Sequence, residues 1–539
     1  MRTLPWMITL LGATIAVGCG DNDDTDLPAD QVDADDDSFT ADEDCDDSNA
    51  AINPRALELC DGVDNNCDGL IDGPDSDDAV DYFADADADG YGDPLDVVTS
   101  CDPVDGYIAD NNDDCDDNRD DTFPGAEDIP WDTIDQDCDG ADLCGIAGVI
   151  TEEQLDLLDV EIRFNADTFC EDFPDGVVVE GTLRIGLSNM DDFTALDCIC
   201  GATAIDLTGS PFLTLEGLEK VVALEGDLIV AGNDLLTSLK GLDRLQSVGG
   251  SVDLSGNNRL TDLLPLAALT SIGGDLTINN NFALFTLAGF DNLNDLGGNL
   301  RIAFNSTLST LNGLEGLTTL NQVLSIQDNP GLSDLTGLDN ITNIGAEVDF
   351  EDNEGLEDLT GFNSVTEING TLTIANNDAL LDLSGIQNID TINGNLILRD
   401  NDEIGSLIGL SNALVATGGL SLINNARLTN LSNASTSSFG GNLVIQEMNA
   451  LEDVDDLNGI AFGGNLTLSR NAALENVDGF SHLTTIGGNL NINNAAQLNS
   501  LEGFANITEI SGNAIFEFNP RLPDMLGMET LTEIGGDLE

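Results

Sequence analysis

From about residue 178 onward, apolar and polar positions repeat with a 24-residue period. The period is visible in "SIGGDLTINNNFALFTLAGFDNLN" (271–294) and again in "TIGGNLNINNAAQLNSLEGFANIT" (485–508). Apolar residues at unit positions 6 and 8, such as Leu276 and Ile278, predict a strand with one buried face. Leucines at positions 14, 17, 20 and 23 would line the remaining sides. A fixed period of this length predicts stacked coils that bury their apolar sides against each other.

Two further unit positions carry a structural signal. Glycines at positions 4 and 19 suit tight corners, and a stacked asparagine can bond the backbone of adjacent coils. Asparagine fills position 11 in most units: Asn233, Asn257, Asn281, Asn305, Asn329, Asn353, Asn377, Asn401, Asn425, Asn471 and Asn519. Ala495 breaks this series, the unit with Met448 is shifted, and two units near Ser438 are short. We expect a structural role for the asparagines.

The pattern "I-x-G-x-L-x-I-x-x-N-x-x-L-x-x-L-x-G-L" resembles leucine-rich repeats of the receptor L-domain type. The resemblance implies a mainly β fold, a right-handed leucine-rich-repeat β-solenoid over residues 178–539, with residues 143–177 as its N-terminal cap or transition. It says little about the ligand, because one fold hosts many partners. Outward strand positions are the candidates for contact: Arg301, Gln327, Asp349, Glu351 and Arg399. The chain ends in "EIGGDLE", inside another strand, which suggests a truncated sequence or an end covered by a partner.

Charge changes the picture for the first third of the chain. The protein has 102 Asp and Glu against 14 Lys and Arg, with a formal net charge of −88. Such a surface repels nucleic acid and anionic lipid headgroups and attracts cations. Adaptation to high salt is an alternative explanation of the acidity, but it would not explain the spacing of the loops described below.

The N-terminus predicts export. "MRTLPWMITLLGATIAVGCG" has a charged start, an apolar run and small residues before Cys19. "AVGC" resembles a bacterial lipobox, which implies cleavage of residues 1–19 and lipidation of Cys19; an ordinary signal peptide is the alternative. Residues 20–41 read as a disordered acidic tether. We therefore expect a lipid-anchored envelope protein, at the outer membrane or cell surface, that contacts the membrane through its lipid only.

Residues 42–142 form a module rich in Cys and Asp, and "DADADGYGDPLD" within it has the spacing of a calcium loop. Gly90 stands where the backbone must turn sharply. Oxygen ligands would come from positions 1, 3, 5, 7, 9 and 12, which are Asp85, Asp87, Asp89, Tyr91 (through its carbonyl), Asp93 and Asp96. An EF-hand has a glutamate where this loop has Asp96.

Two other stretches share this rhythm. "DNNCDGLIDGPD" would use Asp64, Asn66, Asp68, Leu70, Asp72 and Asp75. "DQDCDGADLCGI" starts with Asp135, Asp137 and Asp139 but lacks acids at positions 9 and 12, so it is an incomplete site. "DEDCDD" (42–47) and "NDDCDD" (112–117) begin similarly without the glycine.

The module is internally duplicated. Residues 42–69 match residues 112–140, with Cys45 opposite Cys115 and Cys67 opposite Cys138. In an exported protein this favours the disulfides Cys45–Cys67 and Cys115–Cys138. Cys60 has no counterpart, so we expect it to pair with Cys101; ten cysteines leave other connectivities open.

The duplicated unit resembles the MopE-type metal-binding motif of bacterial surface proteins. Copper does not carry over from that resemblance, because an N-ligand copper site needs imidazoles and the module has no histidine. Oxygen ligands favour calcium, so we expect a disulfide- and calcium-stabilised module before the solenoid.

No catalytic motif is recognisable, and we do not expect an enzyme. The leading hypothesis is a calcium-binding stalk that presents the solenoid to a surface protein or glycan, with its oligomeric state open. The alternative is a surface protein that sequesters calcium or copper and uses the solenoid as scaffold.

Overall fold

The structure is a computed structural model that divides into two compact units, one of residues 1–129 and 134–141 and one of residues 130–133 and 142–539. Only part of each unit is described: residues 32–109, 111–126, 134–138, 148–151 (backbone only), 176–184, 197–411 and 413–539. The predicted lipidation site at Cys19 and most of the predicted tether lie outside these residues. No helix in the described part of the chain is long and apolar enough to cross a membrane.

The first unit, the Asp-rich module, contains one small antiparallel sheet and many turns. Its strands are β1 (Val80–Ala84), β2 (Asp93–Ser100) and β3 (Tyr107–Ile108), in the order β2-β1-β3. The β1–β2 register shifts between Phe83 and Ala84, directly before the predicted calcium loop. A side chain at Gly92 would meet the Cβ of Phe83 at 2.8 Å, so this residue must be small. The sheet therefore fixes both ends of that loop.

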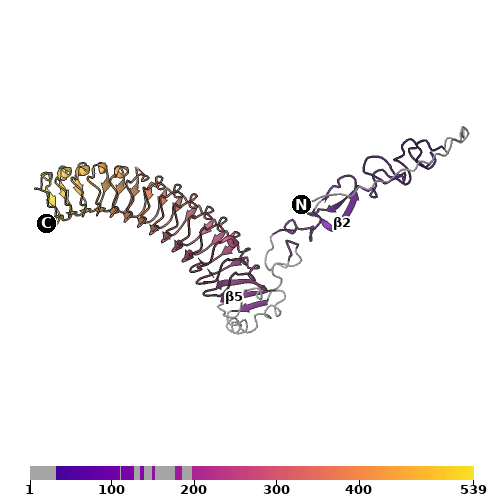
Figure 1. The fold of residues 1–539 in the computed structure, drawn as a ribbon, viewed down its shortest axis with the longest axis horizontal. Coiled ribbons are helices and arrows are strands. Elements are labelled where there is room, and N and C mark those ends of the chain that lie inside the picture. The colour runs from indigo at the N-terminus through magenta and orange to yellow at the C-terminus, as the bar shows by residue number, and fades with distance from the viewer. Residues whose placement is uncertain are drawn as a thin grey trace, which may run out of the picture. The chain divides into compact units, whose positions relative to one another are not determined.

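The second unit is a β-solenoid whose strands follow one another in chain order along a curved stack (Figure 1). It begins with β4 (Gly148–Thr151), β5 (Val177–Arg184) and β6 (Ile199–Asp206), which pair in parallel. Each later coil adds one parallel strand to this sheet: β8 (Leu228–Ile229), β10 (Val252–Asp253), β12 (Leu276–Asn279), β14 (Leu300–Ala303), β16 (Leu324–Gln327), β18 (Val348–Glu351), β20 (Leu372–Ala375), β22 (Leu396–Arg399), β24 (Leu420–Ile423), β26 (Leu443–Gln446), β28 (Leu466–Ser469), β30 (Leu490–Asn493) and β32 (Ala514–Glu517).

Two-residue strands form a second series of parallel pairings just before each main strand. They are β7 (Ala223–Leu224), β9 (Ser247–Val248), β11 (Ser271–Ile272), β13 (Asp295–Leu296), β15 (Thr319–Leu320), β17 (Asn343–Ile344), β19 (Glu367–Ile368), β21 (Thr391–Ile392), β23 (Val415–Ala416), β25 (Ser438–Phe439), β27 (Ala461–Phe462), β29 (Thr485–Ile486), β31 (Glu509–Ile510) and β33 (Glu533–Ile534). Short 3-10 turns complete five coils: η3 (Leu264–Leu266), η4 (Ser432–Ala434), η5 (Asp455–Leu457), η6 (Asp478–Phe480) and η7 (Glu502–Phe504).

The register confirms the period read from the sequence. Leu276 pairs with Leu300, which pairs with Leu324 in the next coil. The two short units are also present, because Val415 pairs with Ser438 and Ser438 pairs with Ala461. The chain therefore loses one residue twice without losing its strand register.

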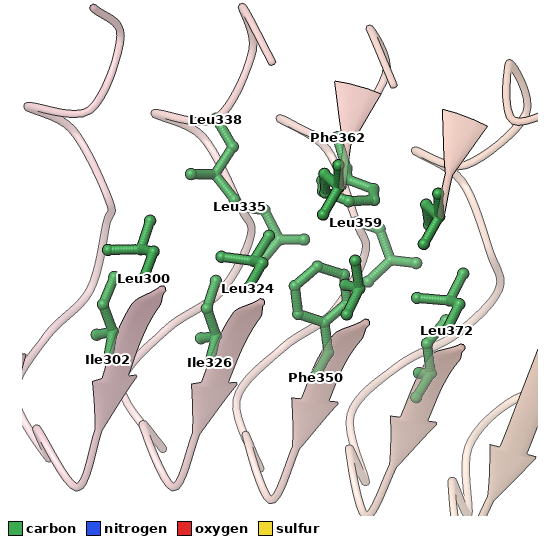
Figure 2. Close-up of a cluster of buried hydrophobic side chains, with 14 of the residues drawn as sticks. Leu300, Ile302, Leu324, Ile326, Leu335, Leu338, Phe350, Leu359, Phe362 and Leu372 are labelled. Carbon is green, nitrogen blue, oxygen red and sulfur yellow. The ribbon is translucent and has the colours of Figure 1, made fainter. Parts of the chain in front are cut away.

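Apolar side chains from the strand and from the opposite side of each coil meet in one continuous core. Figure 2 shows Leu324 and Ile326 of β16 facing Leu335 and Leu338 of the same coil, and this layer repeats in the neighbouring coils. Phe350 packs edge-on against Phe362, with ring centroids 5.2 Å apart. Because every layer has apolar residues at the same unit positions, each coil completes the core of its neighbours.

The asparagines at position 11 form a buried ladder between coils. The Asn257 Oδ1 accepts the backbone N–H of Asn233 at 3.1 Å, and its Nδ2 donates to the Val230 carbonyl at 2.7 Å. The same pair of bonds recurs through the stack, as at Asn377 and Asn401. Most of these amides thus satisfy two backbone groups that the turn would otherwise bury unpaired, whereas the Nδ2 atoms of Asn233 and Asn281 are buried without a partner.

Met448 and Ala495 occupy ladder positions without an amide. Both are fully buried, and their backbone N–H groups still donate to Asn471 and Asn519 of the following coils. Met448 therefore stands in register, and the shift predicted for its unit reflects the 23-residue spacing rather than a misplaced side chain.

The glycines serve two different purposes. At position 19, Gly289 has φ +122°, and an added Cβ would lie 2.0 Å from the Leu263 carbonyl oxygen. At position 4, Gly274 has no positive φ, but an added Cβ would lie 2.9 Å from the backbone of Gly250. The corner prediction therefore describes position 19, whereas position 4 needs glycine because adjacent coils approach closely.

Candidate metal centre

The predicted loop at residues 85–91 connects β1 to β2 and gathers three carboxylates. Ligand oxygens of Asp85, Asp87 and Asp89 lie within 4.8 Å of one another. The loop turns through left-handed conformations at Ala88 (φ +69°) and Gly90 (φ +95°). Asp87 accepts the N–H of Asp89 at 3.2 Å, which holds the turn closed. The sequence spacing therefore brings its first three acids to one centre.

The segment "NDDCDD" (112–117), which we call the second cysteine motif, closes this loop from the other side; "DEDCDD" (42–47) is the first cysteine motif. The Asp117 carboxylate accepts the Ala86 N–H at 2.7 Å, and the Asp114 N–H donates to the Gly92 carbonyl at 3.3 Å. The Tyr91 ring stacks on Phe123, with centroids 5.3 Å apart. These contacts place Asp114 and Asp117 beside the loop acids, and we call these five carboxylates (Asp85, Asp87, Asp89, Asp114 and Asp117) the loop-85 cluster.

Four of these residues carry a buried carboxylate oxygen with no hydrogen-bond partner: Asp85 Oδ1, Asp87 Oδ2, Asp89 Oδ2 and Asp114 Oδ2. The Asp114 side chain is among the most enclosed, because the residue is only 3% exposed. A buried, unpaired carboxylate oxygen costs free energy unless a donor or a cation meets it. The arrangement therefore fits a cation that takes oxygen ligands.

The pKa values in the cluster shift in the direction expected of crowded acids. Burial raises the pKa of Asp89, and the charges of Asp87 and Asp85 raise it further. Burial likewise raises the pKa of Asp114 and of Asp117, with added repulsion from the loop acids. Without a cation, the protein disfavours full ionisation here, whereas a bound divalent cation would favour it.

The expected positions 9 and 12 have other partners. Asp93 begins β2, and its carboxylate accepts the Leu95 N–H at 2.7 Å. Asp96 accepts the Tyr107 hydroxyl at 3.2 Å, and its charge raises the pKa of that tyrosine. Asp93 nevertheless lies near enough to Asp117 to raise the pKa of that carboxyl. The structure also brings Asp114 and Asp117 to the loop, which the sequence pattern did not indicate because "NDDCDD" lacks a glycine. The sequence feature that could have indicated them is the aspartate on either side of Cys45 and of Cys115.

The loop at residues 64–75 uses its acids differently. Asp64 accepts the N–H groups of Asp68 and Gly69 at 3.1 and 3.0 Å, so it caps its own turn. Asp72 accepts the Gly62 N–H at 2.8 Å. Among the described residues, no carboxylate of this loop holds a buried, unpartnered oxygen. The predicted ligand set Asp64, Asn66, Asp68, Leu70, Asp72 and Asp75 therefore stays a prediction, in which Asp64 and Asp72 also bond backbone N–H groups.

A residue outside the calcium pattern organises that loop. Glu58 is 3% exposed, and its carboxylate accepts the N–H groups of Asn65 and Asn66 at 2.8 and 3.0 Å. The third loop is described only through residue 138. Asp135 and Asp137 lie within it, while Asp139 lies outside the described residues.

Three disulfides hold the module: Cys45–Cys67, Cys60–Cys101 and Cys115–Cys138. The duplication suggested the first and third pairs, and the lack of a counterpart to Cys60 suggested the second, so all three expected disulfides are present. Sulfur atoms of two of them lie beside Asp44 and Asp114, but a disulfide sulfur is no thiolate ligand. Cys198 and Cys200, at the start of the solenoid, are also disulfide-bonded.

Two of the solenoid's outward arginines pair with acids of other coils. Arg301 contacts Asp275 at 2.7 Å, and Arg399 contacts Glu351 at 2.9 Å. His482, the single histidine, contacts the carbonyls of Gly479 and Ile460 through its two ring nitrogens.

Comparison with known families finds similarity in the module. The family described as "Putative metal-binding motif" (Cu-binding_MopE) matches residues 44–73 and 114–142. The matched segments contain Asp114 and Asp117 and both cysteine pairs of the duplication, whereas the loop at residues 85–91 lies between them. No curated protein matches the chain. The similarity therefore supports metal binding by the module and leaves the identity of the metal open.

Proposed function

We propose that this chain is a non-enzymatic protein of the bacterial cell surface whose Asp-rich module binds calcium and carries the solenoid as a binding face. The observation behind this proposal is the convergence of buried, unpartnered oxygens in the loop-85 cluster. The cluster offers carboxylate oxygens, and calcium takes six to eight oxygen ligands in flexible geometry.

The disulfides support an exported location, because such bonds persist in oxidising compartments. The lipobox-like sequence before Cys19 supports a lipid anchor, and the repeat pattern supports a right-handed solenoid of the receptor L-domain type. A surface protein or glycan is the partner that we propose for the solenoid.

Calcium titration of the full chain by calorimetry tests the proposal. We expect binding in the micromolar to millimolar range and loss of one site in Asp87→Asn. The matched control is Asp102→Asn, which removes an exposed acid of the same module. Absence of heat and of any circular dichroism change at millimolar calcium would overturn the calcium assignment.

Sequestration of metal is the second candidate, because acids are abundant in the module. It predicts many weak sites, or selective copper uptake, instead of a few sites. The number of ions bound at saturation, measured with calcium and with copper, separates the two functions.

A further inference from the structure

Residues 33–39 fold into the same turn as the loop at residues 85–91, although they lack its glycine. The left-handed residues fall at matching positions: Asp36 (φ +67°) and Ser38 (φ +88°) correspond to Ala88 (φ +69°) and Gly90 (φ +95°). One carboxylate bond also repeats. Asp37 accepts the Phe39 N–H at 2.9 Å, as Asp89 accepts the Tyr91 N–H at 2.8 Å. This segment differs from the disordered tether expected there.

The first cysteine motif closes this turn as the second motif closes the other. The Asp47 carboxylate accepts the Ala34 N–H at 3.0 Å, the counterpart of the bond from Ala86 to Asp117. Asp44 accepts the Asp46 N–H at 2.9 Å, and Asp114 accepts the Asp116 N–H at 2.8 Å. Two copies of one arrangement therefore exist in the module.

The acids in the first copy also converge with unpartnered oxygens. Ligand atoms of Asp33, Asp35 and Asp47 lie within 4.8 Å of one another, as do those of Asp35, Asp37 and Asp44. Both Asp35 oxygens, Asp37 Oδ2 and Asp44 Oδ2 are buried without a hydrogen-bond partner. Asp44 is only 7% exposed, so its free oxygen is held inside the cluster and away from water. A cation is the group that such oxygens lack.

We propose that residues 33–47 form a second site for a hard divalent cation of the calcium class. Five carboxylates would supply it: Asp33, Asp35, Asp37, Asp44 and Asp47. The inference rests on the proposed calcium function and extends it to the turn at residues 33–39, which lies before the family-matched residues 44–73; Asp44 and Asp47 lie within them. Each cysteine motif then contributes two acids to an ion whose other ligands come from the preceding loop.

The two sites differ in how far the loop lies from its cysteine motif. The closing bond spans 13 residues in the first copy and 31 in the second. The longer connection contains β2 and β3, which build the small sheet. In the first copy, no strands separate the turn at residues 33–39 from its cysteine motif. The turn therefore follows directly on the acidic N-terminal sequence and is hard to distinguish from it.

The first site is expected to bind more weakly. Ser38 adopts a left-handed conformation at a cost that glycine avoids. Asp33 also accepts the N–H groups of Asp37 and Ser38 at 3.2 and 2.9 Å, which leaves its oxygens less available than Asp85 Oδ1.

Calcium calorimetry on the full chain, with terbium luminescence as a second probe, tests the inference. We expect Asp35→Asn to remove one bound ion and to leave the ion lost in Asp87→Asn in place. The matched control is Asp36→Asn in the same turn, because Asp36 is exposed and asparagine tolerates its left-handed conformation. Ser38→Gly is expected to tighten the first site severalfold, so the proposal does not depend on a loss of function alone.

The outcomes are separable. If Asp35→Asn and Asp36→Asn bind as many ions as the unmodified chain, and Ser38→Gly changes no affinity, the second site is refuted while the loop-85 cluster stands. If Asp87→Asn also changes nothing, the proposed function fails as well. Hydrogen exchange over residues 45–73 verifies that each variant keeps the fold of the first cysteine motif.

Discussion

The Asp-rich module and the solenoid are both acidic, but they use their acids in opposite ways. In the module, carboxylates gather in groups of three, such as Asp85, Asp87 and Asp89, and leave buried oxygens unpartnered. In the solenoid, acids are spread along the stacked coils and several pair with arginines of neighbouring coils, as Glu447 does with Arg470 at 2.7 Å. The 24-residue repeat spreads its acids along the stack, although Glu347 and Glu351 still repel Asp349 within one coil, whereas the irregular module folds acids from separate segments together. Concentrated charge demands a cation, and dispersed charge needs only solvent and salt.

The same contrast governs what stabilises each unit. The solenoid buries an unbroken series of Leu, Ile, Val and Phe side chains, and its sequence after Cys200 contains no cysteine. The described part of the module buries very few apolar side chains, among them Ile52 and Ala84, and contains three disulfides. Small units without a core rely on covalent links and metals. The two halves should therefore fail under different treatments.

The largest expected effect comes from truncating a buried side chain in the solenoid core. Phe350→Ala should lower the stability of the surrounding coils by about 3–5 kcal/mol, because it leaves a cavity in a fully buried layer. Hydrogen exchange should show lost protection near β16, β18 and β20 and unchanged protection in the module. Phe282→Ala is the control, since that ring is 50% exposed. Reduced calcium binding in Phe350→Ala would contradict the separation of the two units.

Removing a disulfide should break the module alone. Replacing both Cys115 and Cys138 by alanine opens a link of 23 residues, which is worth about 3 kcal/mol. Calcium affinity should fall in parallel, because Asp114 directly precedes Cys115. Replacing Cys60 and Cys101 is the matched control: it should cost stability with a smaller loss of affinity, since neither residue adjoins the cluster. Equal affinity losses in both variants would show that the disulfide does not position Asp114.

These contrasts also explain what the sequence could predict. The solenoid was readable because one rule, 24 residues with fixed apolar positions, holds from coil to coil and even survives two deletions near Ser438. The left-handed backbone conformation at unit position 10 could not be predicted. Asn280 and Asp328 tolerate this conformation well, but Phe304 and Phe518 adopt it too. The backbone of the neighbouring coils imposes that conformation whatever the side chain.

The metal centre was readable only in part. Asp85, Asp87 and Asp89 are close in sequence, so local spacing was enough to group them. Asp114 and Asp117 reach the loop through a tertiary contact, which spacing does not encode. The local motif therefore grouped the three acids that are close in sequence, while the acids that reach the loop through tertiary contacts could not be found from spacing.

The asparagine ladder tests whether the solenoid's order depends on polar as well as apolar burial. Asn377→Ala should cost about 1–3 kcal/mol for each backbone group left unpaired, here the Asn353 N–H and the Phe350 carbonyl. Ala495→Asn should instead stabilise its coils by restoring a missing rung to Asn471. Thermal and denaturant unfolding measure both changes. Changes of opposite sign in the free energy of unfolding would show that the amide itself stabilises the coils. A destabilised Ala495→Asn variant with lost coil protection would show that position 495 has no room for the amide.

The smallest expected effect is the response of the solenoid's dispersed acids to pH. Burial raises the pKa of Asp349, and Glu347 and Glu351 raise it further; burial and then Asp352 do the same for Asp328. A raised folded-state pKa gives stability that is present at low pH and lost as pH rises through that value. Arg470 and Gln446 instead lower the pKa of Glu447, whose contribution is lost as pH falls.

Coils near β18 should therefore gain protection between pH 7.5 and about pH 4–5, while the coil of Glu447 should not. Salt should reduce the difference, because these charges are near the surface and are screened. Hydrogen exchange, corrected for intrinsic rates, measures it, and Asp349→Asn should weaken the response while the exposed control Glu357→Gln preserves it. Equal pH responses in the two coils would mean that the summed charge of the solenoid, and not the local partners of each acid, determines the response. The acids of the solenoid would then act collectively, as those of the module do.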